Sequence, residues 1–195
     1  MSILAVEDLT VHRGYRCLVR NLSLTVGEGE AIHLSGSNGV GKTSLLETLA
    51  GLREPAAGTV APLPEARFLH WIGHKNALNL SLTPQENLEF WCGLNGQPGT
   101  AVVEVLARMG VERVRHRPCR TLSAGQKRRS ALARLLIVHR PLWLLDEPLD
   151  GLDAQGLQCF AGVLQGHLSA GGGAVITSHQ PLPAGIGGIR PLHLS

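Results

Sequence analysis

A glycine-rich octapeptide has the residues needed to hold a chain of phosphates. It consists of Gly36, Ser37, Asn38, Gly39, Val40, Gly41, Lys42 and Thr43. The spacing GxxxxGK[ST] lets backbone amides turn toward a β-phosphate, brings the Lys42 charge to the β- and γ-phosphates, and offers the Thr43 hydroxyl to Mg2+. The alternative is a glycine turn capped by Thr43. The apolar strand before the loop and the helix after it favour a nucleotide site, because that is the context the motif requires.

Two carboxylates follow the apolar run LWLL, which has the pattern of a buried strand. Ligands of parallel sheets bind at the carboxyl ends of the strands. Asp146 is therefore a candidate Mg2+ ligand acting through water, and Glu147 is a candidate base that polarises the attacking water. An apolar strand that ends in Asp-Glu is usually structural, so this assignment depends on the glycine loop. Together the two motifs predict a nucleoside triphosphatase.

Alternating strand and helix patterns predict an α/β fold with a mostly parallel sheet flanked by helices. Residues 3–11 and 22–26 predict an N-terminal antiparallel β layer, separated by the turn-rich residues 12–17. Other strands are expected at residues 31–36, 67–73, 142–146 and 174–178, and helices from about residue 42 and at 83–91, 100–109, 123–138 and 155–168. The glycine- and proline-rich tail from Gln180 leaves no room for a further regulatory domain.

The sequence LSAGQ, Leu122 to Gln126, opens one of these helices and lies 20 residues before Asp146 (146 minus 126). Taken alone it is an ordinary capping box. With the two motifs above, the chain resembles the ABC ATPase family, whose signature LSGGQ stands in this position; Ala124 replaces one glycine. In that family the signature of one subunit closes over ATP bound to the glycine loop of the other. The resemblance implies a homodimer in which Ser123, Gly125 and Gln126 contact ATP in trans.

Further segments match the same family. LDGLD, residues 149–153, corresponds to the D-loop, and His179 corresponds to the switch histidine near the γ-phosphate. Most members carry a glutamine that touches Mg2+ and couples to the permease, and His74 stands there in this chain. The aromatic residue that stacks on adenine is replaced by Arg13, with Tyr15 as the alternative, since a guanidinium or a phenol can each stack on a base.

The segments WIGH, SGSNGVGKTSLL, SAGQKRRSALARL and SHQPL resemble one branch of the family, the CcmA subunits of cytochrome c biogenesis, also called haem exporter protein A. This likeness implies a single ABC ATPase domain, residues 1–195, with a helical subdomain of about 75–135 inserted in a RecA-like core. It also implies a peripheral ATPase on the cytoplasmic side of the cell inner membrane. The implied partners are a CcmB-like permease, a CcmC-like protein and a haem chaperone.

Composition removes several other classes of protein. A net charge of +3 is too small to indicate nucleic acid, and no apolar run reaches the roughly 18 residues of a membrane span, so we expect membrane contact through partners.

A soluble ABC protein acting on ribosomes would have tandem cassettes or a strongly basic surface. A GTPase would need an NKxD motif. An ABC subunit of another small-molecule permease remains the alternative. His70 and His74 are four apart, but His70 is expected in a strand, where that spacing makes no metal pair.

Overall fold

The structure is a computed structural model that describes residues 2–61 and 68–195. The chain divides into two compact units. The first contains Met1–Gly73, Arg140–Glu147 and Gln165–Ser195, and the second contains His74–His139 and Pro148–Leu164. The organisation as one ABC domain with an inserted helical subdomain stays a prediction.

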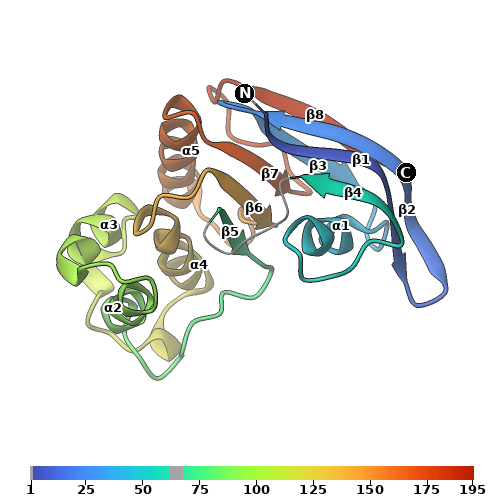
Figure 1. Ribbon diagram of the computed structural model, residues 1–195. Helices are drawn as coiled ribbons and strands as arrows, with labels where there is room; N and C mark the ends of the chain where they lie inside the picture. The colour runs from blue at the N-terminus through green and yellow to red at the C-terminus, as the bar shows by residue number, and fades with distance from the viewer. Residues whose placement is uncertain (1, 62–67) are drawn as a thin grey trace. The chain divides into compact units, whose positions relative to one another are not determined.

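An antiparallel sheet of three strands forms one layer of the first unit, in the order β2-β1-β4 (Figure 1). Its strands are β1 (Ser2–Arg13), β2 (Arg16–Gly27) and β4 (Ala57–Ala61). The antiparallel layer is confirmed. The turn lies within the expected residues 12–17 but is shorter, because both strands continue to the Arg13–Arg16 pair and leave Gly14 and Tyr15 to turn. Gly14 has φ 59°, a conformation that glycine adopts without strain.

The second layer is a parallel sheet in the order β5-β6-β7-β3-β8. Its strands are β3 (Ala31–Gly36), β5 (Leu69–Ile72), β6 (Leu142–Asp146), β7 (Gly173–Thr177) and β8 (Ile189–Leu194). Every residue of β6 and β7 is buried, as expected for central strands covered on both faces. Arg67, the first residue of one expected strand, lies outside the described residues. Helix α1 (Lys42–Leu49) begins where the sequence predicted.

Strand β8 corrects the expectation that residues 174–178 are the last strand. Leu192 is less exposed than Pro191 and His193, and Leu194 is buried, so the last residues of the strand alternate as in a half-buried strand. The strand pairs in parallel with β3 at an edge of the sheet. Pro191 has no amide hydrogen to donate, and an edge strand tolerates this because one of its sides is unpaired. The glycine and proline residues before it therefore connect two strands.

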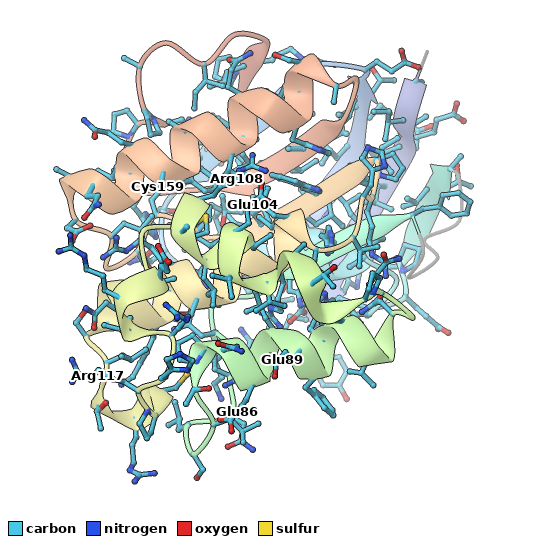
Figure 2. All side chains as sticks on the ribbon, turned by 90° about the vertical axis from the view of Figure 1, so that its left-hand side faces the viewer. Glu86, Glu89, Glu104, Arg108, Arg117 and Cys159 are labelled. Atoms are coloured by element: carbon cyan, nitrogen blue, oxygen red, sulfur yellow. The ribbon has the colours of Figure 1, made fainter. Side chains whose placement is uncertain are left out.

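The second unit is helical. Its elements include α2 (Pro84–Leu94), α3 (Val102–Arg108), α4 (Ala124–Leu132) and the first part of α5 (Ala154–Ser169). Helix α2 begins with a capping box, because the Thr83 side chain accepts from the Glu86 amide and the Glu86 carboxylate accepts from the Thr83 amide. The bond from the Thr83 amide holds the pKa of Glu86 below its usual value. Figure 2 labels this residue on α2, and also Glu104 and Arg108 on α3.

Two helices of the second unit differ from the expected lengths. The helix expected over 123–138 is α-helical only to Leu132 and continues as a tighter 3-10 turn, η4 (Ala133–Leu136). The helix expected over 100–109 begins with the 3-10 turn η1 (Gly99–Ala101) before α3. Two further 3-10 turns, η2 (Glu112–Val114) and η3 (Cys119–Thr121), connect α3 to α4. Short 3-10 segments at helix ends are common and leave no mark on the apolar periodicity.

Candidate nucleotide site

The glycine loop connects β3 to α1 in the first unit, and its glycines are required by their surroundings. Gly36 has φ 147° and Gly41 has φ 121°, both in the region that disfavours side chains. A Cβ on Gly36 would lie 2.6 Å from the carbonyl oxygen of Leu194, and one on Gly41 would lie 2.9 Å from Cβ of Leu18. The loop is therefore fixed in shape by a backbone that only glycine allows.

Lys42 lies within the turn of this loop and is 7% exposed. Its Nζ donates to the carbonyl oxygens of Gly36 at 2.8 Å and Ser37 at 3.3 Å. The ammonium is thus held against the loop backbone at the first turn of α1, where the partial charge of the helix is also positive. This arrangement fits an anionic phosphate group.

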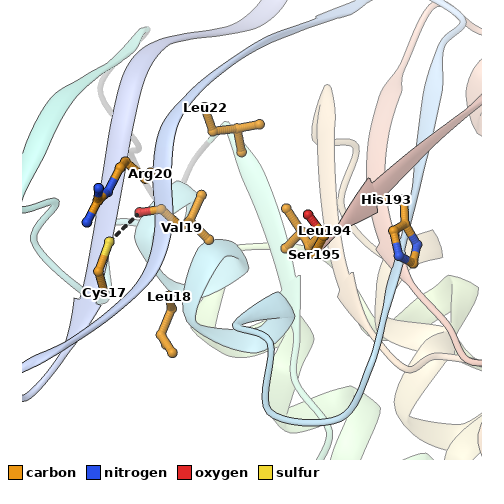
Figure 3. Close-up of a pocket in the computed structure, with 8 residues that line it drawn as sticks. All are labelled: Cys17, Leu18, Val19, Arg20, Leu22, His193, Leu194 and Ser195. Carbon is orange, nitrogen blue, oxygen red and sulfur yellow. Dashed lines mark hydrogen bonds between the residues drawn. The ribbon is translucent and has the colours of Figure 1, made fainter.

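A hollow of about 350 Å3 lies between β2 and the C-terminal end of β8 (Figure 3). It is lined by Cys17, Leu18, Val19, Arg20, Leu22, His193, Leu194 and Ser195. Leu18 and Leu194 are also the residues that crowd Gly41 and Gly36, so the hollow adjoins the glycine loop. Arg13, the predicted adenine contact, is exposed at the end of β1 and is not among the lining residues.

The structure brings the two predicted Mg2+ ligands together. The Thr43 hydroxyl donates to the Asp146 carboxylate, with distances of 2.9 Å to Oδ2 and 3.2 Å to Oδ1. Asp146 is 2% exposed and also accepts from the Thr177 hydroxyl at 2.8 Å. The same Thr177 oxygen accepts from the amide of Glu147 at 2.9 Å. Thr177 therefore links both carboxylate residues, a role that the sequence analysis missed.

Glu147 adopts a strained backbone conformation, with φ 48° in a non-glycine residue. Its Oε1 lies 3.3 Å from Nε2 of His179, and its Oε2 accepts from the His179 amide at 3.2 Å. The Glu147 side chain is 10% exposed, whereas the His179 side chain is 50% exposed. A buried carboxylate is thus oriented by a histidine that solvent can reach, which is the geometry of a positioned proton acceptor.

Thr177→Val tests the link between the carboxylates. Valine has nearly the same shape, but it removes the donor to Asp146 and the acceptor of the Glu147 amide. We expect the free energy of unfolding to fall by about 1–3 kcal/mol, as is usual when a buried hydrogen bond is lost, and ATP turnover to fall with it. Urea denaturation of this variant and of Thr177→Ser measures the effect. A serine variant as unstable as the valine variant would show that the hydroxyl is not what matters.

The signature residues lie in the second unit, at the start of α4. Ser123 accepts from the Gln126 amide at 3.2 Å, and the Gln126 side chain accepts from the Ser123 amide at 3.1 Å, so the capping box is confirmed. Gly125 packs against the D-loop segment, because a Cβ there would lie 2.7 Å from the carbonyl oxygen of Gly151. Ala124 is exposed, which explains why alanine is tolerated where the family signature has glycine.

Gly125→Ala tests this close contact. The added methyl group must displace the Gly151 backbone, so we expect ATP turnover to fall about tenfold while the affinity of the glycine loop for ATP stays unchanged. Turnover assays and nucleotide titration separate the two effects. Ala124→Gly is the matched control and should behave like the parent protein. Equal turnover in all three proteins would refute the role given to Gly125.

His74, another predicted site residue, is largely exposed and forms a weak ion pair. Its side chain is 70% exposed, and Nδ1 lies 3.8 Å from the exposed carboxylate of Asp150. Such a pair contributes little to stability, because water screens it. His70, in contrast, is 2% exposed in β5 and lies edge-to-face against Trp143 at 6.4 Å, so it is a core residue. Residues 2–61 and 68–195 contain no cluster of three or more metal-ligating side chains.

Comparison with known proteins supports this fold and gives the family. A family profile described as "ABC transporter" matches residues 19–150. The chain is 44% identical to the cytochrome c biogenesis ATP-binding export protein CcmA of Rhodobacter capsulatus, over all of this chain and 88% of that protein. It is also 44% identical to CcmA of Paracoccus denitrificans, over 93% of this chain and 85% of that one.

Solved structures show the same fold at lower identity. A putative ABC transporter ATP-binding protein from Pyrococcus furiosus superposes with a TM-score of 0.85 at 21% identity, over 98% of this chain and 96% of that one. A dimeric ATP-binding cassette in a post-hydrolysis state, bound to ADP and Pi, superposes with a TM-score of 0.79 at 22% identity, over 91% and 88% of the two chains.

The parallel sheet, glycine loop and paired carboxylates define an ATPase subunit of the ABC type. The chain belongs to the CcmA family of cytochrome c biogenesis ATP-binding export proteins within that class. In the part of the chain that the structure describes, no helix is both long and apolar enough to cross a bilayer.

Proposed function

We propose that this ATPase drives a membrane permease in the export or delivery of haem for c-type cytochrome biogenesis. The observation that carries the choice of pathway is the 44% identity to CcmA of Rhodobacter capsulatus over the whole of this chain. The geometry of the first unit supports the chemistry, because Glu147, Asp146 and Thr43 meet beside the glycine loop. The alternative is an ABC subunit that serves a different small-molecule permease.

Mg2+ fits the oxygen atoms that this site offers. A carboxylate and a hydroxyl are the hard ligands that this ion prefers, and the Asp146 carboxylate and Thr43 hydroxyl lie within 2.9–3.2 Å of each other. Bound Mg2+ would neutralise charge on the phosphate oxygens of ATP. Thr43 would bind it directly and Asp146 through water, while Lys42 would hold the β- and γ-phosphates. These assignments are proposals for both residues and for the ion.

Glu147 is the proposed base in this reaction. A carboxylate fixed by the His179 amide and by its own strained backbone can accept a hydrogen bond from water without losing further freedom. His179 would contact the γ-phosphate, and Arg13 the adenine. We further propose that Ser123, Gly125 and Gln126 act on ATP bound to the other subunit of a homodimer, while His74 lies in the segment that senses the permease.

The proposed partners are a CcmB-like permease, a CcmC-like protein and a haem chaperone. The corresponding location is peripheral, on the cytoplasmic side of the cell inner membrane, with membrane contact through these partners and with no nucleic acid bound. The moderate net charge of +3 supports this absence of nucleic acid.

Co-purification from native membranes tests the proposal. Tagged Glu147→Gln protein should retain its partners in an ATP-bound complex. Mass spectrometry identifies the bound subunits, and an absorbance spectrum of the eluate shows whether haem is present. Recovery of cytochrome c maturation permeases supports the proposed function. An unrelated permease would favour the alternative and remove haem from the proposal, and an eluate without membrane proteins would contradict both.

A further inference from the structure

A buried arginine in the second unit connects three segments, one of which begins with the candidate signature. Arg128, on α4, is 3% exposed. Its Nε donates to the Pro148 carbonyl at 3.2 Å, and its Nη1 donates to Oδ1 of Asn76 at 3.1 Å. Pro148 directly follows Glu147 in the chain, and Asn76 lies two residues after His74. One guanidinium therefore connects α4 to the segment after β5 and to the segment that leads into the D-loop.

A second arginine holds the same asparagine. Nη2 of Arg134, in η4, donates to the Asn76 carbonyl at 3.0 Å, and its guanidinium lies 5.3 Å from the centre of the Trp91 ring. Burial lowers the pKa of Arg134, as desolvation does for any cation. Hydrogen bonds from charged donors are about twice as strong as those between neutral groups. Asn76 is thus the shared acceptor of two charged donors from one continuous helical segment.

We propose that Asn76 is a positioning residue that makes the segment beginning at His74 and helix α4 move as one body. A displacement of the first segment is passed through both guanidinium groups to α4, and through Arg128 to Pro148. The inference rests on the proposed function, because the displacement originates in the permease. It goes beyond the proposed function by naming Asn76 as the residue through which the signature helix follows the displacement of the segment beginning at His74.

The chain offers a conservative variant, a disruptive variant and a control. Asn76→Asp keeps an oxygen where Oδ1 accepts from Arg128, whereas Asn76→Ala removes it. Asn79→Ala is the matched control, because Asn79 lies in the same segment but bonds to Ser81 and Asn87. An asparagine whose side chain only filled space would show no such preference for an acidic replacement.

Hydrogen–deuterium exchange on the purified full chain tests the coupling without any partner. In Asn76→Ala we expect the amides of residues 74–82 and 123–132 to exchange together, at least about fivefold faster than in the parent. The aspartate variant should stay within about twofold of the parent over both ranges. Asn79→Ala should do so over residues 123–132, because it removes only the acceptor of the Ser81 amide in the first range. Faster exchange confined to residues 74–82 would overturn the proposal, because it would show that α4 does not depend on the Asn76 side chain.

Turnover in the complex recovered from membranes gives the functional result. Asn76→Ala should lower kcat about tenfold and leave the Kd for ATP unchanged, and Asn76→Asp should restore kcat. An equal loss of ATP affinity, or an aspartate variant as impaired as the alanine variant, would overturn the proposal. Recovery of an unrelated permease would defeat the haem assignment but not this inference, which the exchange measurement decides by itself.

Discussion

Glu147→Gln is expected to bind ATP normally and to turn it over at least about a hundredfold more slowly than the parent, with a dimer accumulating in the presence of Mg2+ and ATP. Glutamine has the same shape as glutamate. Its side-chain oxygen can still accept from the backbone amide of His179, which lies 3.2 Å from Oε2 of Glu147 in the parent. The substitution removes the negative charge that would polarise water. Nucleotide titration, steady-state turnover and size-exclusion chromatography measure the three effects.

A control separates the loss of this carboxylate from the loss of any acidic residue. Glu54→Gln changes an exposed carboxylate outside the site and should leave turnover and the elution volume unchanged. Turnover of Glu147→Gln equal to that of the parent would remove Glu147 from the role of base. A loss of ATP affinity in the same variant would show instead that the side chain contributes to binding.

Local sequence patterns predicted the parts of the structure that depend on neighbouring residues. The capping boxes at Thr83 and Ser123 need only a hydroxyl and a side-chain acceptor three residues later, so both could be read directly. The glycine loop is local in the same sense, since its spacing fixes which amides turn inward. The start of α1 at Lys42 follows from that spacing.

Contacts between distant segments could not be predicted in this way. Strand β4 is largely exposed and gives no apolar pattern, so its pairing with β1 had no signal in the sequence. Thr177 lies 31 residues from Asp146, and Asn76 lies 52 from Arg128. In each case an ordinary polar residue gains its role only when tertiary structure brings the partner to it.

Lys42→Ala is expected to reduce ATP affinity by about a hundredfold or more, because the variant loses the point charge at the β- and γ-phosphates. Lys42 is 7% exposed and its ammonium is held by the carbonyl oxygens of Gly36 and Ser37, so no solvent-exposed cation can replace it at the same place. Binding of a fluorescent ATP analogue to the purified chain measures the change directly.

The stability of this variant distinguishes a binding defect from a folding defect. Removing Lys42 loses two hydrogen bonds but also removes the cost of burying a charge, so we expect the free energy of unfolding to change by no more than about 1 kcal/mol. Arg108→Ala removes an exposed cation from α3 and should alter neither quantity. ATP affinity retained in Lys42→Ala would contradict the glycine-loop assignment. A loss of affinity together with a loss of several kcal/mol of stability would mean that Lys42 stabilises the loop itself and does not act by binding the phosphates. A phosphate contact stabilises the protein only when nucleotide is bound.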